Sequence, residues 1–497
     1  MHSGFSPESF PDSSADNPSG QSLVLPRLVV SSISGGGGKT LLSLGLARAL
    51  AQNGHAVLPF KKGPDYIDAA WLAAAAGRPA TNLDPFFLNG DRLRAQMGHA
   101  ACTLLADNER PRALAVIEGN RGLFDGLDLD GSCSTSALAR ELRVPVVLTI
   151  NVTKMTRTVA ALLQGLEHFE QGVHFAGVVL NRTGSARHAS YVRQSIERYT
   201  DFTVLGELPR LKTNLLPERH MGLASLRGDE LADSARSALE ELASFIRDHV
   251  DLERIVRAAK AAPALSCGPF WQPPKRSPEY RPCIGYVRDA CLWFYYRENL
   301  EALERAGGRL VRLSLSDPAW PWEGENGLDA LYLGGGFPED FLDLLEDNPR
   351  LQEIAHFSAQ GFPVYAECGG LMLLSRSVRR AQRCTRMAGV LPLDIEFCPR
   401  PQGLGYVRGT IAHPNPFYAQ GTTLIGHEFH YSRVLNASVG EAAVLKLERG
   451  MGLGEGRDGL VAGNTWGSYT HIFAPAAPGW AEGLCRLATE WHTRHTA

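Results

Sequence analysis

The chain has 497 residues, which is too long for one ordinary domain, so two or three domains are expected. Its formal charge of −3 gives no electrostatic basis for binding nucleic acid or membrane lipid, and no apolar run reaches the length that spans a bilayer. The nine cysteines occur singly, without a Cys-x-x-Cys pair, which favours a reducing cytoplasm over a disulfide framework.

Composition divides the chain into parts. Met1–Gln21 is rich in Ser, Pro, Asp and Gly and lacks the basic start and apolar centre of a secretory signal, so we expect a disordered tail over residues 1–25. Residues 263–281 read as a semi-rigid linker. The prolines of this linker are Pro263, Pro269, Pro273, Pro274 and Pro278.

Between the tail and the linker, over residues 26–262, apolar runs alternate with amphipathic helical stretches. This pattern predicts an α/β domain with a mostly parallel, doubly wound sheet covered by helices on both faces. The ligands of such sheets bind beyond the C-terminal ends of the strands. The expected strands are Leu28–Val30, Ala56–Phe60, Leu114–Ile117, Val144–Ile150 and Gly177–Leu180.

A glycine loop joins the first of these strands to a helix. Ser34–Thr40 reads Ser-Gly-Gly-Gly-Gly-Lys-Thr, and its backbone N–H groups, the helix N-terminus and Lys39 predict a phosphate site. Thr40 is expected to hold Mg²⁺. The usual opening glycine is replaced by Ile33, and the alternative is a glycine-rich turn with an incidental lysine. The residues expected to bind ATP in this loop are Gly35, Gly36, Gly37, Gly38, Lys39 and Thr40.

Polar segments follow the other strands of this domain. Lys61–Asp68, with its two carboxylates, suits Mg²⁺ and anionic groups or, as the alternative, a turn that caps the next helix. Asn82–Pro85 reads as a further acidic turn, and Glu118, directly at a strand end, as a second Mg²⁺ contact. The amide of Asn181 suits a purine edge or a helix cap. Leu216–His220 is a polar loop without an assignable role.

Residues 282–497 predict a second doubly wound domain, and its chemical centre is Cys368. Val364–Met372 reads as strand, sharp turn and helix with this cysteine at the apex, where a nucleophile is exposed and the helix N-terminus lowers the pKa of its thiol. His471 offers the base, and Gly335, Gly336 and Gly369 an oxyanion hole. The expected strands are Ile284–Val287, Leu310–Leu313, Ala330–Leu333 and Pro363–Tyr365.

Two other segments of this domain are distinctive. Asp289–Tyr296 places four aromatic residues after a strand, which predicts a flat apolar face or an interdomain contact. Gly426–Ser432 groups two histidines with a glutamate, but the spacing differs from that of a His-Glu-x-x-His zinc site, so we do not expect a metal there. The remaining cysteines are expected to be small buried hydrophobes.

With both centres in view, the chain resembles the cobyrinate a,c-diamide synthase family, whose wider group includes cobyric acid synthase and dethiobiotin synthetase. The resemblance extends from about Leu28 to Phe473. Its marks are the glycine loop, Gly63–Asp68, Glu118–Gly126, Asn181-Arg182, Pro217–His220, Phe294–Tyr296, Glu367–Met372, Gly426–Ser432 and Ser468–His471.

The resemblance implies a dethiobiotin synthetase-like ATP domain followed by a class I glutamine amidotransferase-like domain. ATP and Mg²⁺ would activate the a- and c-acetate carboxylates of cobyrinate, a corrinoid, as acyl phosphates. Cys368, assisted by His471, would release ammonia from L-glutamine. In the residues implied for the first domain, Thr40, Asp65 and Glu118 hold Mg²⁺, Asn181 and Arg182 bind ATP, and Asp65, Tyr66, Ile67 and Asp68 lie toward the corrin carboxylate.

The sequence departs from the family pattern at three positions. Ser32 stands where relatives usually carry a glycine, and Ala366 replaces the first glycine of the nucleophile turn. Phe473 stands where many amidotransferases carry the glutamate of a Cys–His–Glu triad, which predicts a Cys–His dyad.

Two other functions are also compatible with these motifs. A partitioning-type ATPase or regulatory module uses the same loop, but Ser34 in place of that group's lysine argues against it, as do Cys368 and His471. An amidoligase acting on hydrogenobyrinate or nickel-sirohydrochlorin stays open. The resemblance is also compatible with a homodimer.

Overall fold

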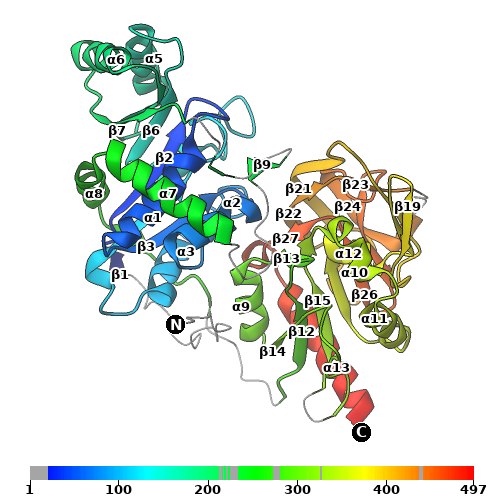
Figure 1. Cartoon of the computed structure of the whole chain (residues 1–497). Coiled ribbons are helices and arrows are strands. Elements are labelled where there is room, and N and C mark those ends of the chain that lie inside the picture. The colour runs from blue at the N-terminus through cyan, green and yellow to red at the C-terminus, as the bar shows by residue number, and fades with distance from the viewer. Residues whose placement is uncertain are drawn as a thin grey trace. The chain divides into compact units, whose positions relative to one another are not determined.

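The computed structural model describes residues 21–211, 215–216, 218–219, 222–223, 233–272, 280–324, 327–435 and 440–496. These residues form two compact units, and the division falls between Gln272 and Pro273 (Figure 1). Within the described ranges, every helix is too short or too polar to cross a membrane.

The first unit is built on a seven-stranded sheet of order β4-β3-β5-β2-β6-β7-β8, in which every neighbouring pair is parallel. Its strands are β2 (Arg27–Ser32), β3 (Ala56–Lys62), β4 (Thr81–Leu83), β5 (Ala113–Glu118), β6 (Val146–Asn151), β7 (Phe175–Thr183) and β8 (Val204–Pro209). All five predicted strands are confirmed. The interpretation of Asn82-Leu83 as part of a turn is wrong, because these residues pair with β3 as a buried edge strand.

Helices cover this sheet, and their bounds are α1 (Lys39–Gln52), α2 (Tyr66–Ala76), α3 (Gly90–Leu104), α4 (Thr135–Glu141), α5 (Thr158–Phe169), α6 (Ala186–Tyr199), α7 (Asp233–His249) and α8 (Leu252–Lys260). The strands β2, β3 and β5 are buried along their whole length, as a parallel sheet between two helical layers requires. Gly45 lets α1 and α7 approach closely, since a Cβ there would lie 2.3 Å from Ile246 Cγ1.

Short strands lie where the sequence predicted a tail and a linker. Strand β1 (Gln21–Leu23) pairs antiparallel with β11 (Leu265–Cys267), so both ends of the first unit are fixed beside each other. From the polar loop at Leu216–His220, Glu218–Arg219 forms β9 and pairs with β10 (Gly222–Leu223), whereas Pro217 and His220 lie outside the described residues.

The second unit contains a ten-stranded mixed sheet of order β14-β12-β15-β17-β26-β25-β24-β21-β22-β27. Pairing is parallel from β14 to β26 and antiparallel from β26 to β27. Its strands are β12 (Cys283–Val287), β14 (Arg309–Leu313), β15 (Ala330–Leu333), β17 (Val364–Glu367), β21 (Gly403–Ile411), β22 (Thr423–His430), β24 (Ala443–Arg449), β25 (Arg457–Ala462), β26 (Thr465–Ser468) and β27 (His471–Ile472). The predicted parallel strands are confirmed, and the antiparallel half was not predicted.

Smaller elements complete the second unit. Strand β13 (Leu292–Phe294) pairs with β16 (Gly335–Gly336). A separate sheet contains β18 (Ser377–Arg380), β19 (Arg383–Arg386), β20 (Asp394–Phe397) and β23 (Ser432–Val434). The helices are α9 (Arg297–Arg305), α10 (Leu342–Leu345), α11 (Pro349–Ala359), α12 (Gly369–Leu374) and α13 (Trp480–Thr496). Single 3-10 turns span Arg110–Arg112 in the first unit and Pro338–Asp340, Gly440–Ala442 and Ala474–Ala476 in the second.

Candidate active sites

The glycine loop of the first unit leads from β2 into α1. Gly38, the N-cap of α1, has φ 99°, a left-handed conformation that glycine adopts without strain. Gly37 lies so close to β2 that a Cβ there would stand 2.6 Å from Ser32 Cβ. The Lys39 ammonium folds back onto the loop and donates to Ser32 Oγ at 2.9 Å and to the Ser34 carbonyl at 3.2 Å. Ser32, a departure from the family pattern, therefore holds the loop lysine.

Glu118 forms the acidic side of the same site. It ends β5 beside β2, and its Oε1 accepts from Thr40 Oγ1 at 2.7 Å and from Lys61 Nζ at 3.1 Å. Its Oε2 is buried and has no hydrogen-bond partner among the described residues. Burial raises the pKa of Glu118, although the charge of Lys61 opposes this. The residues predicted as Mg²⁺ contacts thus include one carboxylate oxygen that is not engaged by the protein.

Lys61 was missed as a site residue by sequence reasoning. Its ammonium, at the end of β3, lies 2.7 Å from Asp68 Oδ2 and 3.1 Å from Glu118 Oε1, and the side chain is 3% exposed. Burial lowers the pKa of Lys61, but the charges of Asp68 and Glu118 outweigh burial and raise it overall. The signal in the sequence was a lysine at the end of a strand that is otherwise apolar.

The acidic loop after β3 serves as a helix cap. Asp65 is the N-cap of α2, and its Oδ1 accepts from the Asp68 N–H at 2.9 Å, which confirms the alternative interpretation of this segment. Asp65, Tyr66, Ile67 and Asp68 are all half-buried at the start of α2. No group of three His, Cys, Asp or Glu side chains in the described part of the chain is placed to hold a metal ion.

Asn181 lies against the glycine loop. At 6% exposure, it donates from Nδ2 to the Gly37 carbonyl at 3.1 Å, and Thr149 Oγ1 donates to the same oxygen at 3.2 Å. The helix-cap alternative for Asn181 is wrong, because Ser185 is the N-cap of α6. Arg182 follows in a left-handed conformation with φ 60° and an exposed side chain.

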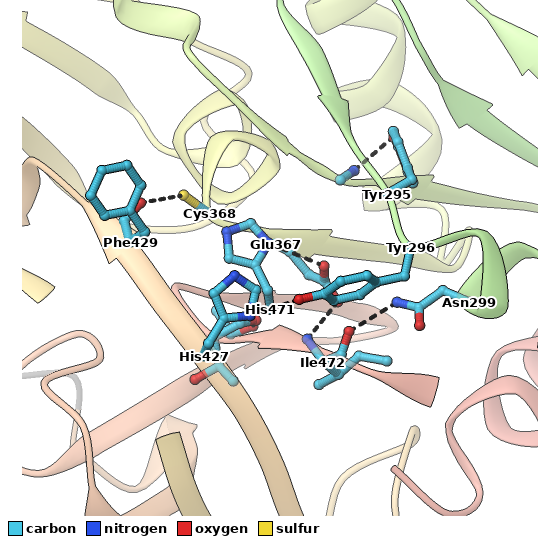
Figure 2. Close-up of polar contacts among 12 residues, drawn as sticks. Tyr295, Tyr296, Asn299, Glu367, Cys368, His427, Phe429, His471 and Ile472 are labelled. Atoms are coloured by element: carbon cyan, nitrogen blue, oxygen red, sulfur yellow. Dashed lines mark hydrogen bonds and ion pairs between the residues drawn. The ribbon is translucent and has the colours of Figure 1, made fainter. Parts of the chain in front are cut away.

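The second centre is organised around Cys368, between β17 and α12. Its backbone has φ 46°, a strained conformation for a residue with a Cβ, and its side chain is 3% exposed. A Cβ on Gly369 would lie 2.8 Å from the Gly336 nitrogen, so two of the three peptides predicted for the oxyanion hole are neighbours. The Cys368 Sγ lies 3.9 Å from the Phe429 carbonyl oxygen (Figure 2).

The predicted lowering of the thiol pKa is wrong. Burial, together with the charge of Glu339, raises the pKa of Cys368, and the neighbouring Gly369 N–H opposes this only in part. Helix α12 has six residues, so it contributes little positive potential against a fully desolvated site. A base that takes the proton during attack is therefore required.

His471, the predicted base, lies at the start of β27. Its ring stacks on His427, the paired residue of β22, with centroids 4.9 Å apart and an interplanar angle of 19°. Gly335 leaves room for it, since a Cβ there would lie 2.3 Å from His471 Cε1. Burial and the neighbouring His471 hold the pKa of His427 well below its ordinary value. Figure 2 shows Cys368 and His471 on one side of the end of β17.

Glu367, also missed as a site residue, lies beneath His471. This fully buried carboxylate ends β17, and its Oε2 lies 3.5 Å from His471 Nδ1 (Figure 2). Phe473, which occupies the position of the usual triad glutamate, packs instead against Tyr296 with ring centroids 5.2 Å apart. A glutamate directly before Cys368, at the end of an apolar run, was the only signal of Glu367 in the sequence.

The interpretation of Asp289–Tyr296 as a flat apolar face is wrong for its tyrosines. Tyr295 Oη donates to the Val287 carbonyl at 2.5 Å and accepts from Gly334 N at 2.8 Å, so it supports the backbone just before Gly335 and Gly336. Tyr296 Oη lies 3.3 Å from His427 Nδ1. These rings fold into the interior because their hydroxyls have partners there.

The Gly426–Ser432 segment fixes the turn at Met451-Gly452 through Glu428. Glu428, which is 2% exposed, accepts from Met451 N at 2.6 Å and from Gly452 N at 2.9 Å. His430 stacks on Tyr469 with ring centroids 3.7 Å apart. These contacts give both side chains a structural role.

In a comparison with known proteins, each of the two units matches a family of domains. Residues 28–223 match the CobQ/CobB/MinD/ParA nucleotide binding domain, and residues 283–478 match the CobB/CobQ-like glutamine amidotransferase domain. The chain is 38% identical over 476 residues to the cobyrinate a,c-diamide synthase of Magnetococcus marinus, which covers 94% of this chain and 98% of that protein. With the Archaeoglobus fulgidus protein of the same name it is 38% identical over 451 residues, or 90% and 94% of the two chains.

A solved glutamine amidotransferase from Thermotoga maritima is 13% identical, and the match covers 44% of this chain and 87% of that chain with a TM-score of 0.30. The two domain matches and the two sites define the class of protein: an ATP-dependent amidoligase of the glutamine amidotransferase type. The extended identity to named relatives then identifies the chain as a member of the cobyrinate a,c-diamide synthase family.

Proposed function

We propose that this protein converts the a- and c-acetate carboxylates of cobyrinate to amides in cobalamin biosynthesis, with ATP as co-substrate and glutamine as nitrogen donor. The observation that carries the proposal is the pairing of two sites in one chain. One unit places Lys39 and Thr40 beside Glu118, and the other places Cys368 beside His471 and the Gly336 and Gly369 peptides. The names of the relatives supply the substrate class.

Ammonia is generated at Cys368. His471 takes the thiol proton as Sγ attacks the amide carbon of glutamine, and the Gly335, Gly336 and Gly369 peptides stabilise the oxyanion. His471 returns the proton to the departing nitrogen, the C–N bond breaks, and a glutamyl thioester is left. Water, deprotonated by His471, attacks the thioester, releasing glutamate and the free thiol. Glutamine and water thus give glutamate and ammonia.

The nucleotide unit activates the acceptor. A carboxylate oxygen of cobyrinate attacks the γ-phosphorus of ATP, ADP leaves, and an acyl phosphate forms. Ammonia then attacks the acyl carbon, and inorganic phosphate leaves as the nitrogen loses a proton. Lys39 and the N–H groups of Gly35–Thr40 offset the charge of the transferring phosphoryl group. Repetition at the second acetate gives the diamide.

The residues present suit a magnesium ion. Glu118 offers its unengaged Oε2, Thr40 its hydroxyl, and Asp65 the carboxylate oxygen that does not cap α2. When bound, Mg²⁺ neutralises charge on the ATP phosphates. Asn181 holds the glycine loop through its amide nitrogen, and we assign Asn181 and Arg182 to nucleotide binding. We assign Tyr66, Ile67, Asp65 and Asp68, at the start of α2, to the side of the corrin carboxylate.

The test is incubation of the purified chain with ATP, Mg²⁺, glutamine and one macrocycle at a time, followed by mass spectrometry. Cobyrinate should gain two amides, each replacing a hydroxyl by an amino group, with one ATP consumed per amide. Hydrogenobyrinate and nickel-sirohydrochlorin are the comparison substrates, and preferential amidation of either would reassign the macrocycle. The absence of any ATP-dependent product with all three would contradict the proposal.

Cys368→Ser separates the two half-reactions. This variant should lose glutamine-dependent synthesis and keep synthesis with added ammonium, since ammonium replaces the product of the amidotransferase unit. Retention of glutamine hydrolysis by Cys368→Ser would assign the nucleophile elsewhere.

A further inference from the structure

We infer that Glu367 is the third member of a Cys368–His471–Glu367 triad and acts as a positioning residue that holds His471 as a base. The inference rests on the proposed glutamine hydrolysis at Cys368. It assigns the acid to the residue directly before the nucleophile, because the usual position, two residues after the histidine, is occupied by Phe473.

The geometry around Glu367 is that of an acceptor. Its Oε1 accepts from the Ile472 N–H at 3.3 Å, and its Oε2 accepts from Tyr332 Oη at 3.2 Å and lies 3.5 Å from His471 Nδ1. Burial raises the pKa of Glu367, and the contacts with His471, the Ile472 N–H and Tyr332 Oη oppose this by favouring the charged form. The side chain is 0% exposed, so water does not compete for the imidazole.

An ionised carboxylate at Nδ1 fixes the tautomer of the base. It keeps the proton on Nδ1, which leaves the lone pair on Nε2, and it stabilises the imidazolium that forms when the thiol is deprotonated. The face of the His471 ring is held as well, since His427 stacks on it with ring centroids 4.9 Å apart. Glu367 and His427 therefore constrain one imidazole in both orientation and proton position.

The backbone delivers these groups together. Strand β17 pairs with β26 in parallel, with Glu367 opposite Ser468, and the chain returns from Ser468 through Tyr469 and Thr470 to His471. Asp458 fixes that return by accepting from Tyr469 N at 3.0 Å and from Thr470 N at 2.9 Å. The sheet register thus brings Nδ1 of His471 over the carboxylate.

The test compares Glu367→Gln with wild type in glutamine hydrolysis. The variant keeps the shape of the side chain but supplies an amide in place of the charge. We expect kcat to fall by about 10²- to 10⁴-fold with KM changed by less than about threefold, and the acid limb of the pH–rate profile to move to lower pH, because the ion pair with the imidazolium is gone. Glu367→Asp should recover part of the rate at an unchanged acid limb.

Asp329→Asn is the matched control. Asp329 is also a buried carboxylate of this sheet, 3% exposed, and accepts from Cys283 N and Tyr280 Oη, both at 2.7 Å. It lies at the opposite end of the parallel strands, just before β15, so its replacement should alter stability but not the pH profile. If Glu367→Gln stays within fivefold of wild type, or lowers kcat no more than Asp329→Asn, the inference is wrong.

A measurement on the wild-type protein covers the case in which Glu367→Gln does not fold. Nitrogen-15 NMR of labelled histidines, with His471 assigned by His471→Gln, reports the tautomer at neutral pH. A proton on Nδ1 supports the inference, and a proton on Nε2 of neutral His471 contradicts it. The proposed function is tested apart from this, because loss of glutamine hydrolysis in Cys368→Ser does not depend on which group orients the histidine.

Discussion

Thr40 of the glycine loop donates a hydrogen bond of 2.7 Å to Glu118, which ends the neighbouring strand. This contact joins Thr40, in the first turn of α1, to the carboxylate at the C-terminal end of β5. The glycine loop and the acidic side of the site are therefore held together directly.

Glu118→Gln should weaken binding of Mg²⁺ at the proposed metal site. The amide removes the charge next to the ATP phosphates, so the Mg²⁺ concentration for half-maximal ATP-dependent synthesis should rise by about 10- to 100-fold. Glu240→Gln, which breaks a partly exposed ion pair with Arg48, is the control and should leave the Mg²⁺ dependence as in wild type. An unaltered Mg²⁺ titration for Glu118→Gln would remove Glu118 from the site.

Lys61→Met should destabilise the nucleotide unit. The change leaves Asp68 and Glu118 facing each other without their shared cation, which costs about 3–5 kcal/mol for a buried pair. Denaturant unfolding followed by circular dichroism gives the loss. Adding Asp68→Asn should recover part of it, so the double variant should lose less than the sum of the two single changes. Strict additivity would mean that the ion pair contributes nothing.

Asn181→Ala should loosen the glycine loop. Without the bond to the Gly37 carbonyl, the KM for ATP should rise by about 3- to 10-fold, the equivalent of one ordinary hydrogen bond. Thr149→Val removes the second donor to the same carbonyl and should act in the same direction. Steady-state kinetics with ATP as the varied substrate measures both, and a fall in kcat at constant KM would argue for a role in chemistry instead.

Gly335→Ala should disable glutamine use selectively. The added methyl would lie 2.3 Å from His471 Cε1 and 3.1 Å from Phe294 Cδ2, so the imidazole must leave its position. We expect loss of glutamine-dependent synthesis by about 10²-fold or more, because misplacement of a base by about 1 Å has this cost. Synthesis with added ammonium is the internal control. Equal losses with both nitrogen donors would mean a general folding defect.

His427 should make the amidotransferase unit sensitive to acid. Its pKa is lowered in the folded state, so the unfolded chain binds more protons, and stability falls as pH drops below the unfolded value of about 6.5. The slope from this residue is at most about 1.4 kcal/mol per pH unit. His427→Phe should flatten the decline of Tm between about pH 6.5 and 5, whereas His356→Phe, at an exposed site on α11, should not. Matching curves for wild type and His427→Phe would exclude this cause.

The parallel halves of both sheets were predictable because their strands are continuous buried apolar runs between helical stretches, as β5 and β15 show. The antiparallel half was not, since β21 and β22 mix glycine, charged and aromatic residues and acquire their pairing only in the assembled sheet. The glycine loop and the turn at Cys368 were also predictable, because glycines next to an apolar strand mark both turns locally in the sequence.

Side-chain partners that are distant in sequence could not be predicted. Lys61 and Glu118, or Glu367 and His471, meet only when the strand order brings their ends together. The direction of the thiol pKa was mispredicted for a related reason: the local helix favours the thiolate, but burial of Cys368 by the whole unit outweighs it. Desolvation is a property of the fold, and no local pattern reports it.

Glu367 and Cys368 are consecutive residues of one rigid strand end, so they cannot drift relative to each other. Their common neighbour, His471, lies on β27, a two-residue strand at the edge of the sheet, which among the described residues pairs with β22 alone. The hydrogen bond from Ile472 N to Glu367 and the Asp458 contacts hold that edge strand in place. A displacement of β27 would part the proposed nucleophile from its proposed base without altering either side chain.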